Sequence, residues 1–290
     1  MSLVDKVVVV TGAARGMGRA YVQGFLEKGA RVAALDLSWV PTGVSGDRDD
    51  AFARELQQRD AALPLTCDIT DVEQIQSAYD ATIERFGTVD VLINNASLRQ
   101  IDLFPPTGAV LTLDTRDSDF EKMFAVAVFG TLKLTRAFIR PMLEKRSGSV
   151  IAVSSGGGIP RPDPEGGTMS IAGTSREQPY QSAKAAVTAL FGYLATEVRL
   201  YNVAVNVINP ASAKTTGFEE RALARAAIAG TETARPAGYR TGPARPEHVV
   251  PIALFLAEQD ATTGVSGKIF SVMQWNAANG FGGPDLWAAE

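Results

Sequence analysis

The sequence predicts an α/β protein with one doubly wound, seven-stranded parallel sheet and helices on both faces. Short β-branched runs alternate with segments of helical spacing along the whole chain. The runs are continuously apolar, as expected for parallel strands that are covered on both faces. No linker rich in proline or glycine divides the 290 residues. We therefore expect a single domain over 1–290.

Each predicted strand is a short run rich in valine, isoleucine or leucine. Such side chains pack well on the pleated surface of a buried sheet. In chain order the predicted strands are 6–12 (KVVVVTG), 30–36 (ARVAALD), 63–68 (LPLTCD), 89–96 (VDVLINNA), 148–155 (GSVIAVSS), 202–210 (NVAVNVINP) and 266–272 (SGKIFSV).

The predicted helices lie between these strands. The clearest covers 71–87, because Asp71 is well placed as its N-cap and Gly87 stands at its C-terminal end. The others are a helix that ends at Gly29, a stretch that ends near Arg59, a long region over 119–145, a helix over 180–200 and a helix over 246–258.

Three long irregular stretches interrupt this alternation, namely 98–118, 156–179 and 215–242. Each follows the C-terminal end of a strand, where ligands bind in this architecture. Loops of this length in a compact domain are usually functional or disordered. We expect them to surround a substrate site. Apolar residues at helical spacing over 221–230 suggest a lid and a partly hydrophobic substrate, although ordinary core packing gives the same pattern.

Composition excludes several classes of function. A net charge of −4 argues against nucleic acid and anionic membranes as partners. No apolar run approaches the ~20 residues of a membrane span. The N-terminus lacks a signal-peptide cleavage pattern, and a single cysteine, Cys67, fits a reducing compartment, so we expect a cytoplasmic protein. With one histidine, His248, the chain has too few ligands for an ordinary zinc site, and we expect no metal.

The stretch "TGAARGMG" joins the first predicted strand to the first helix and carries Gly12, Gly16 and Gly18. Glycines at such a junction allow backbone N–H groups to approach a diphosphate at a helix N-terminus. Asp36 ends the second strand and supplies an acceptor for ribose hydroxyls. Its charge would repel a 2′-phosphate, which favours NAD, whereas Arg15 could pair with such a phosphate.

In this order of motifs the chain resembles the short-chain dehydrogenase/reductase family, whose fold is of the Rossmann type. The glycine spacing, "NNAS" at 94–97, "CDIT" at 67–70, "YQSAK" at 180–184 and "INPASAKT" at 208–215 carry the resemblance. It implies a homotetramer and an NAD(P) cofactor. The implied cofactor-binding residues are Gly12, Arg15, Gly16, Met17, Gly18, Asp36, Asp68, Ile69, Asn95, Ala96, Tyr180, Lys184, Pro210 and Thr215.

Tyr180 and Lys184 share a helix face one turn apart. A tyrosine with an ordinary pKa near ~10 is a poor base at neutral pH, but a neighbouring ammonium favours the phenolate. Tyr180 is therefore the expected general acid/base, with Lys184 lowering its pKa and binding ribose. The resemblance implies a serine that orients the substrate oxygen, for which we choose Ser155, with Ser154 as the alternative.

The stretch over 156–179 joins Ser155 to Tyr180 and is longer than the family's usual connection. We expect it to cover the substrate site, with Met169 and Ile171 as apolar contacts beside Ser155 and Tyr180. The alternative is a solvent-facing insertion, because long loops add little closure entropy. The family also often carries an asparagine where this chain has Ala127, which puts its proton relay from lysine to solvent in doubt.

The expected activity is NAD-dependent interconversion of a secondary alcohol and a ketone. Two alternatives stay open at this point. The segments 246–258 and 266–272 vaguely resemble the 3-hydroxyacyl-CoA dehydrogenase branch, although the chain offers no basic cluster for a CoA phosphate. A sensor or scaffold that binds a dinucleotide without catalysis would use the same fold.

Overall fold

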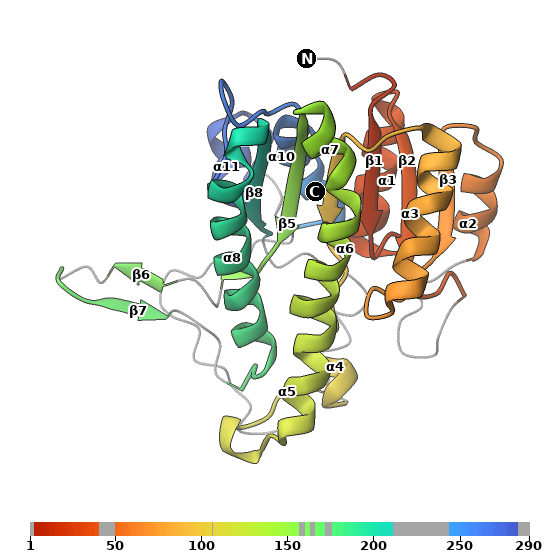
Figure 1. Cartoon of the computed structure of the whole chain (residues 1–290). Coiled ribbons are helices and arrows are strands. Elements are labelled where there is room, and N and C mark those ends of the chain that lie inside the picture. The colour runs from red at the N-terminus through yellow and green to blue at the C-terminus, as the bar shows by residue number, and fades with distance from the viewer. Residues whose placement is uncertain are drawn as a thin grey trace.

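The computed structural model describes residues 3–40, 50–105, 107–156, 160–162, 166–171, 176–210 and 244–283. Its centre is a seven-stranded sheet in the order β3-β2-β1-β4-β5-β8-β9, in which every neighbouring pair is parallel (Figure 1). The strands are β1 (Val7–Thr11), β2 (Arg31–Asp36), β3 (Ala62–Thr66), β4 (Val91–Asn94), β5 (Gly148–Val153), β8 (Val203–Asn209) and β9 (Ile269–Ser271). The predicted α/β class and seven-stranded sheet are confirmed.

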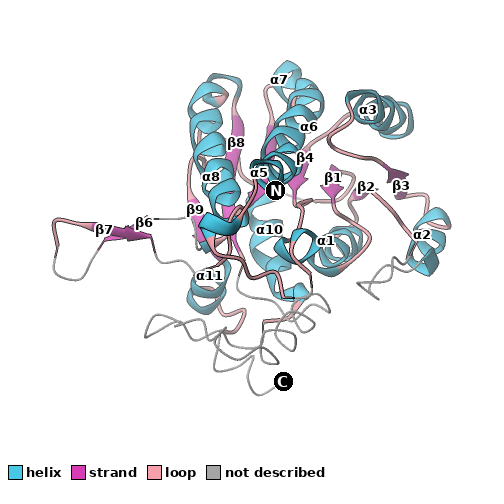
Figure 2. Ribbon diagram, turned by 90° about the horizontal axis from the view of Figure 1, so that it is seen from below, coloured by secondary structure: helices cyan, strands magenta, loops and turns pink. Residues whose placement is uncertain are grey.

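Helices cover both faces of the sheet, as Figure 2 shows. Helices α1 (Gly16–Glu27), α2 (Asp50–Gln57), α10 (Val250–Ala257) and α11 (Val272–Ala278) pack on one face, where Tyr21, Phe25 and Leu56 are fully buried. Helices α3 (Val72–Phe86), α6 (Thr131–Phe138), α7 (Arg140–Lys145) and α8 (Tyr180–Glu197) pack on the other. The five inner strands β2, β1, β4, β5 and β8 are almost wholly buried, as their apolar runs predicted. The edge strands β3 and β9 are only partly buried.

The ends of the helix over 71–87 are as predicted. Asp71 accepts hydrogen bonds from the backbone N–H groups of Glu73 and Gln74, and Gly87 adopts a left-handed φ of 80° at the C-cap. The region 119–145 is less regular than expected, because α5 (Asp117–Phe124) continues into a π-helical turn, η2 (Ala125–Gly130), before α6 and α7.

Further elements lie outside the prediction. Inside the irregular stretches are α4 (Gln100–Leu103), η1 (Thr112–Asp114) and an antiparallel pair, β6 (Pro160–Pro162) with β7 (Met169–Ile171). This pair lies to the side of the main sheet (Figures 1 and 2). The remaining short helices are η4 (Arg199–Tyr201) and η5 (Pro246–Val249). The chain also turns helical again directly after β9, where Ser271 caps α11. The predicted stretch 215–242 lies outside the described residues.

Strand β1 lies between β2 and β4. The chain adds β2 and β3 on one side of β1 and then returns to add β4, β5, β8 and β9 on the other. In doubly wound sheets ligands bind at this reversal, beyond the C-terminal ends of the strands. The turn after β1 and the segment after β4 therefore meet at the position where the glycine-rich turn was expected to bind a cofactor.

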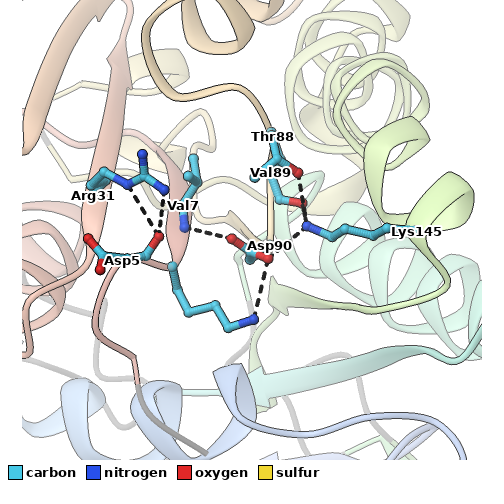
Figure 3. A network of polar contacts seen from close by, with 8 residues as sticks. Asp5, Val7, Arg31, Thr88, Val89, Asp90 and Lys145 are labelled. Atoms are coloured by element: carbon cyan, nitrogen blue, oxygen red, sulfur yellow. Dashed lines mark hydrogen bonds and ion pairs between the residues drawn. The ribbon is translucent and has the colours of Figure 1, made fainter.

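At the N-terminal ends of the strands, a network of polar contacts surrounds Asp90, which directly precedes β4 (Figure 3). Its carboxylate accepts from the Val7 backbone N–H at 2.8 Å and from Lys145 Nζ at 2.7 Å, with Lys6 Nζ at 3.5 Å. Burial works to raise the pKa of Asp90, but the hydrogen bonds from Lys145 and Val7 outweigh it and lower the pKa. One carboxylate thus ties β1, β4 and α7 together.

We expect Asp90→Asn to lower the free energy of unfolding by about 1–2 kcal/mol at pH 7, because the amide keeps an acceptor but loses the charge. Since the pKa of Asp90 is depressed in the folded state, this contribution is lost as pH falls through the folded pKa. Urea unfolding at pH 7 and at about pH 3 measures both effects. Asp60→Asn is the control, because that carboxylate is fully exposed in its pair with Arg85. A difference at pH 7 that persists unchanged in acid would contradict the assignment.

Candidate active site

The glycine-rich turn is shaped by two close approaches of backbone to backbone. Gly12 and Gly16 have left-handed φ values of 64° and 52°. A Cβ on Gly18 would lie 1.8 Å from the Gly12 carbonyl oxygen, and a Cβ on Gly12 would lie 3.0 Å from Ala96 Cα. Only glycine fits at these positions. The turn is therefore pressed against both the first turn of α1 and the segment after β4.

The link to that segment runs through Thr11, which the sequence reasoning did not single out. The Thr11 hydroxyl accepts from the backbone N–H groups of Asn95 and Ala96, both at 3.0 Å, and lies 3.3 Å from the carbonyl of Ile93. The Asn95 side-chain amide donates to the carbonyls of Thr11 at 2.9 Å and Gly12 at 3.2 Å. The Asn95 side-chain amide thus connects the glycine turn to the segment after β4 through two hydrogen bonds.

Asp36 lies at the C-terminal end of β2 and is only 6% exposed. One carboxylate oxygen accepts from the Ala14 backbone N–H at 2.9 Å and the other from the Ser38 N–H at 3.2 Å. These two bonds fix the carboxylate beside the glycine turn, and each oxygen keeps a further lone pair for a ligand hydroxyl. Arg15 stands at the N-cap position of α1 in an extended conformation.

Asp68 and Ile69 follow β3 on the same side. One Asp68 carboxylate oxygen accepts from the backbone N–H and the hydroxyl of Thr70, both at 2.8 Å. Ile69 is buried against η2, where a Cβ on Gly130 would lie 2.9 Å from its carbonyl oxygen. The "CDIT" segment therefore packs against η2 through Ile69.

Tyr180 and Lys184 begin α8 and face one another. The Lys184 ammonium lies 5.7 Å from the centroid of the Tyr180 ring and donates to the Val153 carbonyl at 2.9 Å. Lys184 is 4% exposed, and burial lowers its pKa to about 8. The side chain is therefore mostly charged at neutral pH. The Tyr180 ring packs partly buried beside Met123, Ala127 and Ala183.

The two candidate serines at the end of β5 have different surroundings. Ser154 is buried, and its hydroxyl lies 2.9 Å from the Lys184 carbonyl and 2.6 Å from the Thr188 hydroxyl. Ser155 is half-buried, and its hydroxyl has no hydrogen-bond partner in the part of the chain that the structure describes. Ser154 therefore has a structural role in joining α8 to β5, and of the two only Ser155 has a free hydroxyl.

Gln100 is a second residue that the sequence reasoning missed. It is 3% exposed, donates through Nε2 to the Gln178 carbonyl at 2.6 Å, and accepts at Oε1 from the Tyr180 backbone N–H at 3.2 Å. The sequence placed Gln100 in an irregular stretch without periodicity, so nothing in the local pattern marked it.

The remaining predicted residues are not gathered at this site by the described structure. Met169 lies on β7 and is 64% exposed. The side chain of Ile171 and all of Thr215 lie outside the described residues. Pro210 directly follows β8, at the correct edge of the sheet. His248 lies in η5, where its Nδ1 accepts from the Arg245 backbone N–H at 3.0 Å.

The described part of the chain fits a dinucleotide. The turn after β1 has no side chain at the positions where a diphosphate would approach, the N-terminus of α1 opens onto it, and a fixed carboxylate stands at the end of β2. The same residues contain no cluster of three or more histidine, cysteine or acidic side chains that could hold a metal. None of the described helices combines the length and the apolar character of a membrane span.

Comparison with known proteins agrees with this geometry. A family model described as short chain dehydrogenase matches residues 6–225. Fluoren-9-ol dehydrogenase of Terrabacter sp. (strain DBF63) is 45% identical over 282 residues, which cover 97% of this chain and 74% of that protein. L-fucose dehydrogenase of Bos taurus is 32% identical over 259 residues, which cover 88% of this chain and 83% of that protein.

Solved structures share the fold. Levodione reductase superposes with a TM-score of 0.71 at 23% identity, over 92% of this chain and 96% of that one. The 3-ketoacyl-(acyl-carrier-protein) reductase from Brucella melitensis, solved as a complex with NADH, gives a TM-score of 0.69 at 24% identity, over 93% of this chain and 98% of that one. The strand order, the glycine turn and the match over most of the length together establish that this chain belongs to the short-chain dehydrogenase family.

Proposed function

We propose that this oxidoreductase uses NAD to interconvert a secondary alcohol and a ketone. The observation that carries the proposal is the placement of Tyr180 against the buried Lys184 ammonium. Both lie at the end of β5, where the Ser155 hydroxyl has no hydrogen-bond partner among the described residues. A sensor that only binds a dinucleotide has no need for a buried charge directed at a phenol, since burial of that charge is costly.

Tyr180 acts as the general acid/base. The Lys184 charge beside the ring favours the phenolate, and its low-dielectric surroundings strengthen this effect. In oxidation the phenolate oxygen takes the proton of the substrate hydroxyl, and in reduction the phenol returns a proton to the carbonyl oxygen. The Ser155 hydroxyl donates to the same substrate oxygen and orients it. A bound nicotinamide supplies or accepts the hydride.

The cofactor would lie across the turn after β1. Gly12, Gly16 and Gly18 leave the backbone accessible to the diphosphate, and Asp36 accepts from the adenosine ribose hydroxyls. The fixed Asp36 carboxylate disfavours a 2′-phosphate, so NAD is preferred over NADP. The other expected contacts are Arg15, Met17, Asp68, Ile69, Asn95, Ala96, Lys184, Pro210 and Thr215.

The substrate is a partly hydrophobic secondary alcohol. Support comes from the relative named fluoren-9-ol dehydrogenase, since fluoren-9-ol is a secondary alcohol on an apolar ring system. The relative named L-fucose dehydrogenase suggests a polar sugar instead, and the two can be separated by direct assay. NADH absorbance measured with fluoren-9-ol, simple secondary alcohols and L-fucose tests both the activity and the class. No turnover with any alcohol, despite NAD binding, would favour the sensor.

The proposal includes a cytoplasmic homo-oligomer, a tetramer by family resemblance.

Replacing Tyr180 by phenylalanine should lower kcat by at least about 10²-fold, as is typical when a general acid/base is lost. The affinity for NAD should stay near that of the wild type, because the ring and the glycine turn remain. Steady-state kinetics and fluorescence titration of NADH measure the two quantities. Lys184→Met should impair both, because the ammonium serves the phenol and the ribose. A fully active Tyr180→Phe would remove Tyr180 from the mechanism.

Replacing Asp36 by alanine should narrow the preference for NAD over NADP by about tenfold or more, which corresponds to roughly 1.4 kcal/mol. The change removes both the ribose acceptor and the repulsion of a 2′-phosphate. The readout is kcat/KM for each cofactor, and Arg15→Ala should move the preference in the opposite direction. The unfolding midpoint shows whether loss of the bonds to Ala14 and Ser38 disturbs the fold. If the wild type already prefers NADP, the electrostatic ranking is wrong.

The buried Lys184 should also leave a signature in stability. Its folded pKa of about 8 lies below the ordinary 10.5, so its burial cost is fully present below pH 8 and is lost as pH rises to 10.5. Lys184→Met lacks this dependence. As pH rises from about 8 to 10.5, the free energy of unfolding of the wild type should therefore increase by about 3 kcal/mol relative to that of the variant. Urea unfolding of both proteins without cofactor measures it, and parallel pH profiles would refute the burial effect.

A further inference from the structure

We infer that Gln100 is a positioning residue that fixes the position of Tyr180 relative to the glycine-rich turn after β1. This inference rests on the proposed acid/base role of Tyr180. It assigns to Gln100 no contact with substrate or cofactor. Its effect comes from fastening the backbone on both sides of Pro179, directly before and at the start of α8.

Helix α8 needs such a partner because it begins without a cap of its own. The first N–H groups of a helix have no partner within the helix and are usually satisfied by a side chain at the N-cap. Here the N-cap residue is Pro179, which makes no side-chain cap bond. The Gln100 Oε1 accepts from the Tyr180 N–H instead, and its Nε2 donates to the Gln178 carbonyl. A residue distant in sequence therefore supplies the cap.

Gln100 is itself firmly placed. It opens α4, where its carbonyl accepts from the Phe104 N–H at 3.1 Å. A Cβ on Gly108 would lie 3.0 Å from the Ile101 backbone nitrogen, so the chain folds back closely on α4. Close by, the Val110 N–H donates to the Arg176 carbonyl at 3.1 Å, and Val110 forms a parallel bridge with Glu177. Two irregular stretches of the sequence thus meet just before α8.

The same short segment also reaches the cofactor side. Asn95 fastens the Gly12 carbonyl and Gln100 fastens the Tyr180 N–H, and only residues 96–99 separate the two. The distance between the glycine turn and the tyrosine is therefore set through 95–100. A displacement of about 1 Å at a reacting group can cost about 10²-fold in rate. The Gln100 amide is neutral, so its effect on Tyr180 is geometric and not a direct charge effect.

The test compares Gln100→Met with Gln259→Met. Gln259 is a matched control, because its side chain also bonds two backbone groups. It donates to the Phe255 carbonyl at 2.8 Å and accepts from the Val265 N–H at 3.1 Å. It lies in the connection between α10 and the N-terminal end of β9, away from the proposed site. In alcohol oxidation, Gln100→Met should lower kcat by about 10- to 100-fold and keep the dissociation constant of NADH within about twofold. It should also move the acidic limb of the kcat–pH profile upward, because a displaced phenolate is less stabilised by the Lys184 charge. Gln259→Met should lower the unfolding midpoint without changing kcat or the profile.

Gln100→Glu provides a second variant if Gln100→Met fails to fold. The glutamate keeps the acceptor for the Tyr180 N–H but, when ionised, has no donor for the Gln178 carbonyl. Its kcat relative to wild type should be reduced at neutral pH and should recover as the carboxyl is protonated. A ratio to wild type that is flat with pH and near one would overturn the inference. Equal kcat losses in Gln100→Met and Gln259→Met would overturn it as well.

These outcomes separate this inference from the proposed function. If Tyr180→Phe is inactive while Gln100→Met keeps wild-type kcat and pH profile, only the positioning role is rejected. If Tyr180→Phe is fully active, the acid/base assignment fails first, and the positioning role fails with it.

Discussion

The close passage of the turn after β1 between α1 and β4 is the constraint on which the site depends. With 1.8 Å between a Cβ on Gly18 and the Gly12 carbonyl, and 3.0 Å between a Cβ on Gly12 and Ala96, the turn has a single path. Thr11 and Asn95 then fasten it to the segment after β4. Because β1 and β4 are neighbours at the reversal of the sheet, this passage places the glycine turn, Asp36 and the start of α4 at the same C-terminal ends of the strands, where ligands bind in doubly wound sheets.

Burial of Lys184 is the second feature that organises the site. Its ammonium is removed from water, donates to the Val153 carbonyl and lies against the Tyr180 ring. Such a charge is costly, and the surrounding packing has to stabilise it. The Ser154 hydroxyl contributes by joining the Lys184 carbonyl and Thr188 to the end of β5. Among the described residues the neighbouring Ser155 hydroxyl has no partner. Ser154 thus joins the helix to the strand, and under the proposed function Ser155 would orient the substrate.

The sequence was sufficient for the sheet but only partly for the site. Buried parallel strands produce apolar runs and turns produce glycines, so all seven strands could be located from local pattern, each within a few residues. Thr11 and Gln100 could not be found in this way, because their partners are backbone groups that only the fold brings near. The turn η2 and helix α11 were missed for a related reason, because the contacts they make are with residues distant in sequence. Gly130 of η2 lies against Ile69, and Asn276 of α11 donates through Nδ2 to the His248 carbonyl at 2.8 Å.

Ala127 stands where the family often carries an asparagine, and its surroundings beside Tyr180 are apolar. It lies in η2, 1% exposed, and packs with Met123 and Ala183 beside Tyr180. No side-chain amide from this position can pass a proton on from Lys184, whose ammonium donates to the Val153 carbonyl. The apolar side chains beside the ring would instead strengthen the attraction between the Lys184 ammonium and a phenolate, because they lower the local dielectric constant. Under the proposed mechanism the buried Lys184 charge beside this apolar contact would tune the tyrosine, and Gln100 would hold it in position.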